Sequence, residues 1–254
     1  MSSVAVPRRG SSVPLRRRVM PSSLLSRELI VTLARPRALV IKTLVPLVLT
    51  LPLLLGHAPA FWAAMLFTVL VAIIGAVGTA VTIARARESG LLVRLALTPR
   101  PASLAVIAWM AGAVIIDFLQ LVPTLIALFV LEPVSAADAG ALLAIVVATL
   151  VAANTVGCAI SLLGGGPGEV LVDLAVVLGP LLFLAGLFSG VPREGWRWIA
   201  ARVDPFAYAH SAFLTAFGVD PTFGLRSIVV AAAATVIGCG VVLALLARPV
   251  LQRR

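Results

Sequence analysis

The sequence predicts an all-α membrane protein. Its 254 residues have a mean hydropathy of +1.13, and only 12% of them are charged, about half the charged fraction of an ordinary soluble domain. Two stretches, 58–84 and 227–247, contain no Lys, Arg, Asp or Glu, and each is long enough to provide the roughly 20 apolar residues that cross a bilayer. These observations exclude an ordinary soluble globular fold.

Apolar runs separated by turn residues predict six transmembrane helices. They cover residues 38–55, 60–83, 103–131, 140–163, 170–189 and 227–247. The first run is the least regular, because Lys42, Pro46 and Pro52 lie inside it and Ala-Pro-Ala follows at 58–60. A cleaved secretory signal is the alternative for this run. We expect a span, because some forty residues with eight arginines are long for the leading part of a signal, and Lys42 can snorkel to the interface.

The basic residues flank the predicted spans. The net charge is +10, with eight arginines before the first span, four between 85 and 100, and three between 248 and 254. This bias is typical of cytoplasmic segments, so we expect a multi-pass protein of the cell membrane with both termini in the cytoplasm. A nucleic-acid partner is not expected, because these basic segments lack interleaved aromatic residues.

The chain divides into a tail, an interface helix and a six-span domain. Residues 1–21 are rich in Arg, Ser and Pro and are expected to be a disordered cytoplasmic tail. Residues 22–36 have an amphipathic pattern that includes Arg27 and Glu28, which predicts a helix lying in the plane of the membrane interface. Residues 37–254 are expected to form the six-span transmembrane domain.

Catalytic motifs are missing from the sequence. Lys42 is the only lysine and is not in a glycine-rich loop, so a Walker A site is impossible and any ATP hydrolysis must come from another polypeptide. The glycine-rich turn at 164–168 is not followed by the Lys-Ser/Thr of a phosphate loop. His57 and His210 stand alone, without a zinc or serine-hydrolase pattern. We therefore expect no enzyme, no metal site and no cofactor in this chain.

The loop 84–102 is predicted to contain a short helix. The helix would begin near Glu88, place Leu91, Leu92 and Leu95 on one side, and end at Thr98 and Pro99. One interpretation is a basic amphipathic helix resting on lipid headgroups. The other is a docking helix that inserts into a cytoplasmic partner.

This loop resembles that of the ABC-2-type exporter permeases, which carries the pattern Glu-Arg-Glu-x-Gly-Thr-Leu-x-x-Leu-x-x-Thr-Pro. The matching residues are Arg87, Glu88, Gly90, Leu92, Leu95, Thr98 and Pro99, whereas Ala86 and Leu91 depart from the pattern. A second segment is also similar to the family. Asp204, Pro205 and Tyr208 stand where the family has Asn-Pro-x-x-Tyr, after a Ser-Gly-Val element at 189–191.

The resemblance implies a fold and a mechanism. Residues 190–226 would form short re-entrant helices before the last span, and Trp196, Trp198 and Tyr208 suit an outer interfacial cap. The loop helix would sit in a cleft of a separate ATP-binding-cassette ATPase, which binds ATP and Mg, and two permease chains, identical or homologous, would move an amphipathic or lipid-like substrate such as a drug. The alternative is a six-span channel or secondary carrier without an ATPase, for which pore-lining polar residues or inverted repeats are expected.

Three ionisable residues lie inside the predicted spans: Lys42, Asp117 and Asp173. A carboxylate such as Asp117, near the middle of its span, costs roughly 2.5–3.5 kcal/mol on insertion scales, which makes it a functional candidate. The alternative is a packing residue, with Gln120 one turn away as its partner. Lys42 and Asp173 are predicted at similar depths, which suggests an ion pair between them.

Overall fold

The computed structural model describes residues 36–97 and 101–252, and within these residues the chain is helical with no strand. The elements are α2 (Pro36–Leu55), α3 (Ala60–Glu88), α4 (Leu91–Ala96), α5 (Ala102–Leu131), α6 (Ala136–Ile160), η1 (Ser161–Leu163), α7 (Pro167–Leu184), α8 (Trp196–Val203), α9 (Pro205–Ala216) and α10 (Leu225–Gln252). The predicted tail, the interface helix with Arg27 and Glu28, and the loop residues Thr98 and Pro99 lie outside the described residues.

The all-α membrane fold is confirmed, with five helices long and apolar enough to span a bilayer in the described part of the chain. They are α3, α5, α6 continued by η1, α7 and α10. The first predicted span is α2, whose apolar part, Leu39–Leu55, is shorter than these five. At 1.5 Å per residue the 20 residues of α2 extend about 30 Å, which only just matches the thickness of the hydrocarbon core. A sixth span at α2 therefore stays a prediction.

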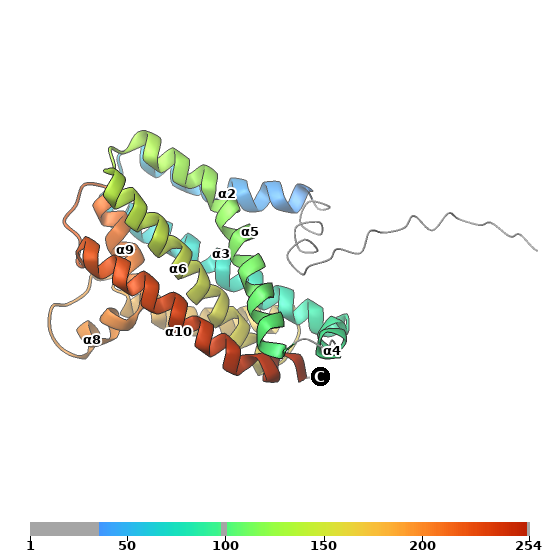
Figure 1. Ribbon diagram of the computed structural model, residues 1–254. Helices are drawn as coiled ribbons and strands as arrows, with labels where there is room; N and C mark the ends of the chain where they lie inside the picture. Colours follow the sequence, from blue (N-terminus) through green and yellow to red (C-terminus); the bar gives the residue numbers. More distant parts are fainter. Residues whose placement is uncertain (1–35, 98–100, 253–254) are drawn as a thin grey trace, which may run out of the picture.

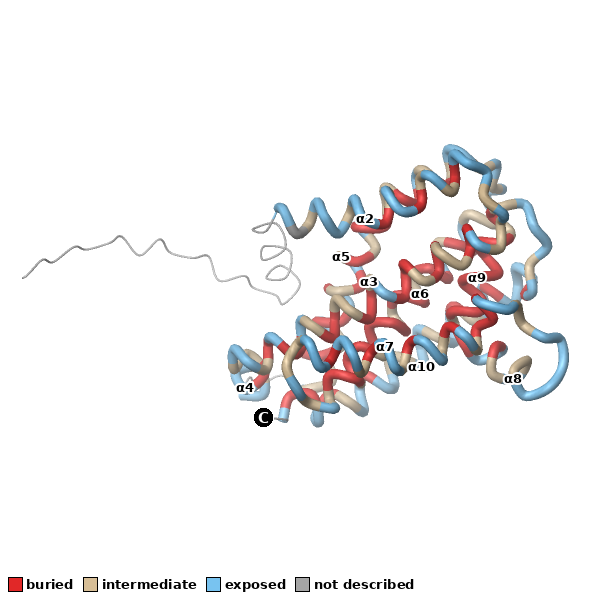
Figure 2. The backbone as a smooth tube through the Cα atoms, turned by 180° about the vertical axis from the view of Figure 1, so that it is seen from behind, coloured by how far each residue is buried: buried red, intermediate tan, exposed pale blue. Residues whose placement is uncertain are grey.

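Helix α6 forms the centre of the bundle and packs on α3, α5, α9 and α10 (Figure 1). Small residues let α3 and α6 approach closely, because a Cβ placed on Gly75 would lie 2.9 Å from that of Ala153. On the facing side, a Cβ on Gly157 would run into the carbonyl oxygen of Ala76. Figure 2 shows that buried residues concentrate on these central helices and on α9, whereas α2 and the loop around α8 are largely exposed.

Helix α5 changes direction, and its second half runs beside α2 (Figure 1). Pro123 lies within this helix and removes one of its backbone hydrogen bonds, the usual cause of such a bend. As a result α2 packs mainly on α5 and leaves an apolar face uncovered, with Val48 62% and Ile41 60% exposed.

Three predicted span ends differ from the observed helix ends. Helix α10 continues past the predicted end at 247 to Gln252. Helix α3 continues past the predicted end at 83 to Glu88 and stops only where Gly90 adopts a left-handed φ of 68°. Helix α7 ends at Leu184 and not at 189, because Gly186 turns the chain with a φ of 81°. A side chain on Gly186 would collide with Val191, so this turn tightly joins α7 to the segment before α8.

Candidate functional site

The predicted loop helix is α4, a six-residue helix that follows directly on α3 (Figure 1). Its start differs from the prediction, since Glu88 closes α3 and the new helix begins at Leu91. The break occurs at Ser89 and Gly90, where the left-handed glycine lets the backbone turn. Helix α4 therefore forms a corner at the end of a long span.

The leucine side of α4 faces its own bundle. Leu92 is 1% exposed, and Leu91 and Leu95 pack against the same cluster. That cluster joins the ends of four other helices through Ile83, Ala86, Val106, Trp109, Met110, Cys158, Leu243, Ala247, Val250 and Leu251. Since the predicted stripe is used within the chain, any partner must meet a different side of α4.

The outward side of α4 is apolar and basic. Leu97 is 81% exposed and Val93 is 50% exposed, and Arg94 is exposed between them. Glu88 is exposed just before the corner, and its carboxylate lies beside the glycine turn, 3.8 Å from a Cβ placed on Gly166. Exposed apolar residues beside an arginine suit contact with a partner protein as well as with lipid headgroups.

Arg87 fastens this corner to the neighbouring helix. Its guanidinium donates a hydrogen bond to the backbone carbonyl oxygen of Ser161, at the junction of α6 and η1. The Ser161 hydroxyl in turn donates to the carbonyl oxygen of Cys158 at 2.6 Å. Arg87 therefore acts within the chain, whereas Glu88 and Arg94 stay available on the surface.

The opposite end of the bundle carries the two short helices α8 and α9. Asp204 ends α8 and caps α9, because its Oδ1 accepts a hydrogen bond from the Phe206 backbone N–H at 2.9 Å and Pro205 occupies the first turn. Burial raises the pKa of Asp204 to about 7. Asp204 thus serves as the N-cap of α9, at the position where the pattern described above has Asn.

An aromatic stack holds this end together. Phe223 lies between Trp198 and Tyr208, with ring centroids at 5.3 Å and 4.3 Å. The Tyr208 hydroxyl donates to the carbonyl oxygen of Arg202 at 2.8 Å. Trp196, in contrast, is 67% exposed. Of the two tryptophans predicted for an outer cap, one is structural and the other is available to the surroundings.

The sequence prediction did not identify Arg197 and His210 at this end. The Arg197 guanidinium donates to the Ser189 hydroxyl at 3.0 Å and lies 4.5 Å from the centre of the Phe183 ring. His210 is buried against Phe61, and burial lowers the pKa of its imidazole to about 4. The edge-to-face contact of His210 with Phe61 joins residues far apart in the sequence, so no local pattern could reveal it.

A buried polar network lies in the centre of the bundle. Asn154 on α6 donates to Oδ2 of Asp117 on α5 at 3.1 Å and to the carbonyl oxygen of Leu150 at 2.8 Å. Thr79 on α3 donates to the amide oxygen of Asn154. Asn154 is thus the partner of Asp117, and the predicted partnership with Gln120 is wrong. Both polar atoms of the Gln120 side chain are buried without a hydrogen-bond partner.

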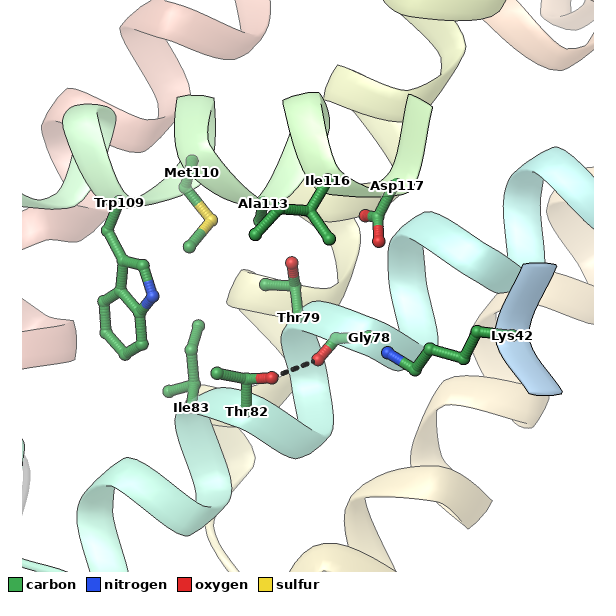
Figure 3. Close-up of a pocket in the computed structure, with 10 residues that line it drawn as sticks. All are labelled: Lys42, Gly78, Thr79, Thr82, Ile83, Trp109, Met110, Ala113, Ile116 and Asp117. Carbon is green, nitrogen blue, oxygen red and sulfur yellow. Dashed lines mark hydrogen bonds between the residues drawn. The ribbon is translucent and has the colours of Figure 1, made fainter. Parts of the chain in front are cut away.

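Lys42 lies across a small cavity from Asp117. The cavity has a volume of about 70 Å³, and Figure 3 shows the Lys42 side chain reaching from α2 toward Gly78, with Asp117 facing the same space. Asp173 is half-buried on α7, and no ion pair joins it to Lys42 among residues 36–97 and 101–252. The predicted pair of Lys42 and Asp173 is therefore not formed, and the carboxylate near Lys42 is that of Asp117.

Comparison with known proteins adds one finding. A family model described as "ABC-2 type transporter" matches residues 22–218, which include α3, α4, α8 and α9. Searches of curated proteins and of solved structures found no match.

Proposed function

The chain belongs to the ABC-2 type transporter family, and from this premise we propose that it is the permease subunit of an exporter driven by a separate ATP-binding-cassette ATPase. Membership makes it the membrane part of a transporter, and its helices suit a multi-pass membrane protein. The proposal adds the ATPase, which binds ATP and Mg, a second permease chain, and a cell-membrane orientation with α4 and both termini in the cytoplasm.

The observation that carries the proposal is the construction of α4. Leu92 anchors the helix in a cluster shared with α3, α5, α6 and α10, while Val93, Arg94 and Leu97 point outward. A force applied to such a corner is transmitted to several spans at once, because packed interiors move as units. This is what coupling to a cytoplasmic ATPase requires.

The substrate proposed for this exporter is amphipathic or lipid-like. Among the described residues Asp117 is the only acidic or basic side chain buried within a span, and both Asp117 and Thr79 are hydrogen-bonded to Asn154. Such an interior provides few polar sites for a hydrated ion. At the other end of the bundle, α8 and α9 would re-enter the membrane as the outer cap.

The test is co-purification of an ATPase with the tagged full chain. Leu97→Asp places a charge on the outward side of α4 and is expected to lower the amount of retained ATP-binding-cassette ATPase about tenfold, since a buried contact residue is worth about 1.4 kcal/mol or more. Val203→Asp is the matched control, because Val203 is also 81% exposed but lies on α8 at the opposite end. Equal retention in both variants would overturn the assignment of α4 as the coupling element.

A further inference from the structure

A groove of about 380 Å³ runs between α2 and α3 and reaches α5. Its wall is mostly apolar and consists of Ile41, Val45, Pro46, Leu70, Ile73, Ile74, Val77, Gly78 and Val81. Three of these side chains are also open to the surroundings, with Ile41 60%, Val45 46% and Ile73 43% exposed. The groove therefore opens on an exposed apolar face of α2 and α3, where a lipid of the surrounding membrane can enter.

Two cations and no carboxylate line this groove. The polar lining residues are Lys42, Thr82, Arg85 and Gln120. Lys42 also borders the cavity of Asp117, whose carboxylate attracts it electrostatically but lies outside the groove. The groove thus presents net positive charge to a ligand, which favours an anionic group.

The positions along α3 place these cations at headgroup depth. Helix α3 has 29 residues, and about 20 residues from its start at Ala60 cross the roughly 30 Å of hydrocarbon. The hydrocarbon boundary then falls near Ala80, so Arg85 lies among headgroups. The Lys42 side chain reaches from α2 toward Gly78, two residues before that boundary (Figure 3). An acyl chain would lie along the apolar wall toward Leu70.

Gln120 supplies a second, independent sign of a ligand. It is 3% exposed, lines the groove, and has no hydrogen-bond partner for either polar atom of its side chain. A buried amide without a partner is costly, and an apolar chain alone would leave that cost in place. The ester oxygens that join a headgroup to its chains would accept from the Gln120 amide.

We propose that the groove between α2 and α3 binds one acidic phospholipid, with its phosphate between Lys42 and Arg85 and its ester region at Gln120. The proposal uses the membrane orientation of the proposed function but not its ATPase. Lipid binding and ATPase retention are therefore measured separately, and either can fail alone.

The experiment counts lipids bound to the full chain by native mass spectrometry. The probes are dioleoyl phosphatidylglycerol, which is acidic, and dioleoyl phosphatidylcholine, which has the same chains and no net charge. Each cation near headgroups favours an acidic lipid about 5-fold, so two cations predict a preference of about 25-fold. Glycerol phosphate, a headgroup without chains, is expected not to bind.

The variants distinguish lipid binding in the groove from unspecific attraction of acidic lipids to the other basic residues of the chain. Arg85→Gln and Lys42→Gln should each reduce the preference about 5-fold, the double variant should abolish it, and Lys42→Arg should retain it. Arg248→Gln, an exposed arginine on α10 away from the groove, should change nothing. Ile73→Trp, which fills the groove, should reduce binding of both lipids. An unchanged preference in the double variant, an equal loss in Arg248→Gln, or binding of glycerol phosphate alone would overturn the proposal.

Discussion

The Asn154 amide on α6 donates a hydrogen bond to Asp117 on α5 at 3.1 Å, and the Asn154 oxygen accepts one from Thr79 on α3. One side chain therefore joins three of the long helices, α3, α5 and α6, through polar contacts that lipid cannot replace. Because Asn154 is 0% exposed and Asp117 is 5% exposed, water does not compensate for their loss.

Asn154→Leu is expected to destabilise the bundle by about 1–3 kcal/mol, because it leaves the buried Asp117 carboxyl without its donor. Thermal unfolding in detergent measures the effect. Thr149→Val is the control on the same helix, since the Thr149 hydroxyl is buried without a partner, and it should be close to neutral. Adding Asp117→Leu to Asn154→Leu should recover part of the loss. If the loss of stability in the double variant equals the sum of the losses in Asn154→Leu and Asp117→Leu measured singly, the hydrogen bond contributes no stability.

Gly157→Ala is expected to destabilise the protein by about 1–3 kcal/mol, because the added methyl group would run into the Ala76 carbonyl oxygen and push α6 away from α3. The same change at Gly238 on α10 meets nothing within 4 Å and should have no destabilising effect. The midpoint of thermal unfolding compares the two variants. A loss at Gly238 as large as that at Gly157 would contradict the close approach of α3 and α6.

The stability of the α8 and α9 unit is expected to depend on pH through Asp204. Its pKa is raised from 3.8 to about 7, so the folded state binds the proton more tightly, and stability falls as pH rises from about 4 to about 7. His210 acts in the opposite direction, since its pKa is lowered from 6.5 to about 4. Only a comparison between variants therefore isolates the Asp204 contribution.

Asp204→Asn keeps an oxygen that can cap α9 but removes the titration. Amide hydrogen exchange of α9, measured between pH 4 and 7 and corrected for intrinsic rates, should show opening that grows with pH in the wild type relative to this variant. Asp204→Ala should open α9 at every pH, because the cap is lost. Parallel pH profiles in the wild type and Asp204→Asn would show that burial does not raise the pKa of the Asp204 carboxyl.

Hydropathy predicts the long spans well, because an uncharged apolar run as long as 227–247 matches the thickness of the hydrocarbon core. It places ends less well, since Gly90 and Gly186 stop or turn helices through backbone conformation and not through polarity. The resemblance to the family identifies the loop of α4 but not which side of the helix is exposed. Leu92 is fully buried because the ends of four other helices meet there, and this packing depends on residues far apart in the sequence.

The partners of ionisable residues were the least predictable part of the site. Depth alone suggested that Lys42 faces Asp173, and spacing alone suggested that Gln120 faces Asp117. The bend of α5 brings α2 beside that helix instead, so Lys42 shares a cavity with Asp117, while Asn154 reaches Asp117 from α6. Such pairings follow from helix arrangement, which one sequence does not encode locally.

The most direct test of the central claim is to label the complex purified through the chain with a photoreactive ATP analogue. We predict that the label is found on a co-purifying ATP-binding-cassette subunit and not on this chain, whose only lysine, Lys42, lies in α2 and not in a phosphate loop. Label on this chain, or transport by the chain purified free of any ATPase, would contradict the account.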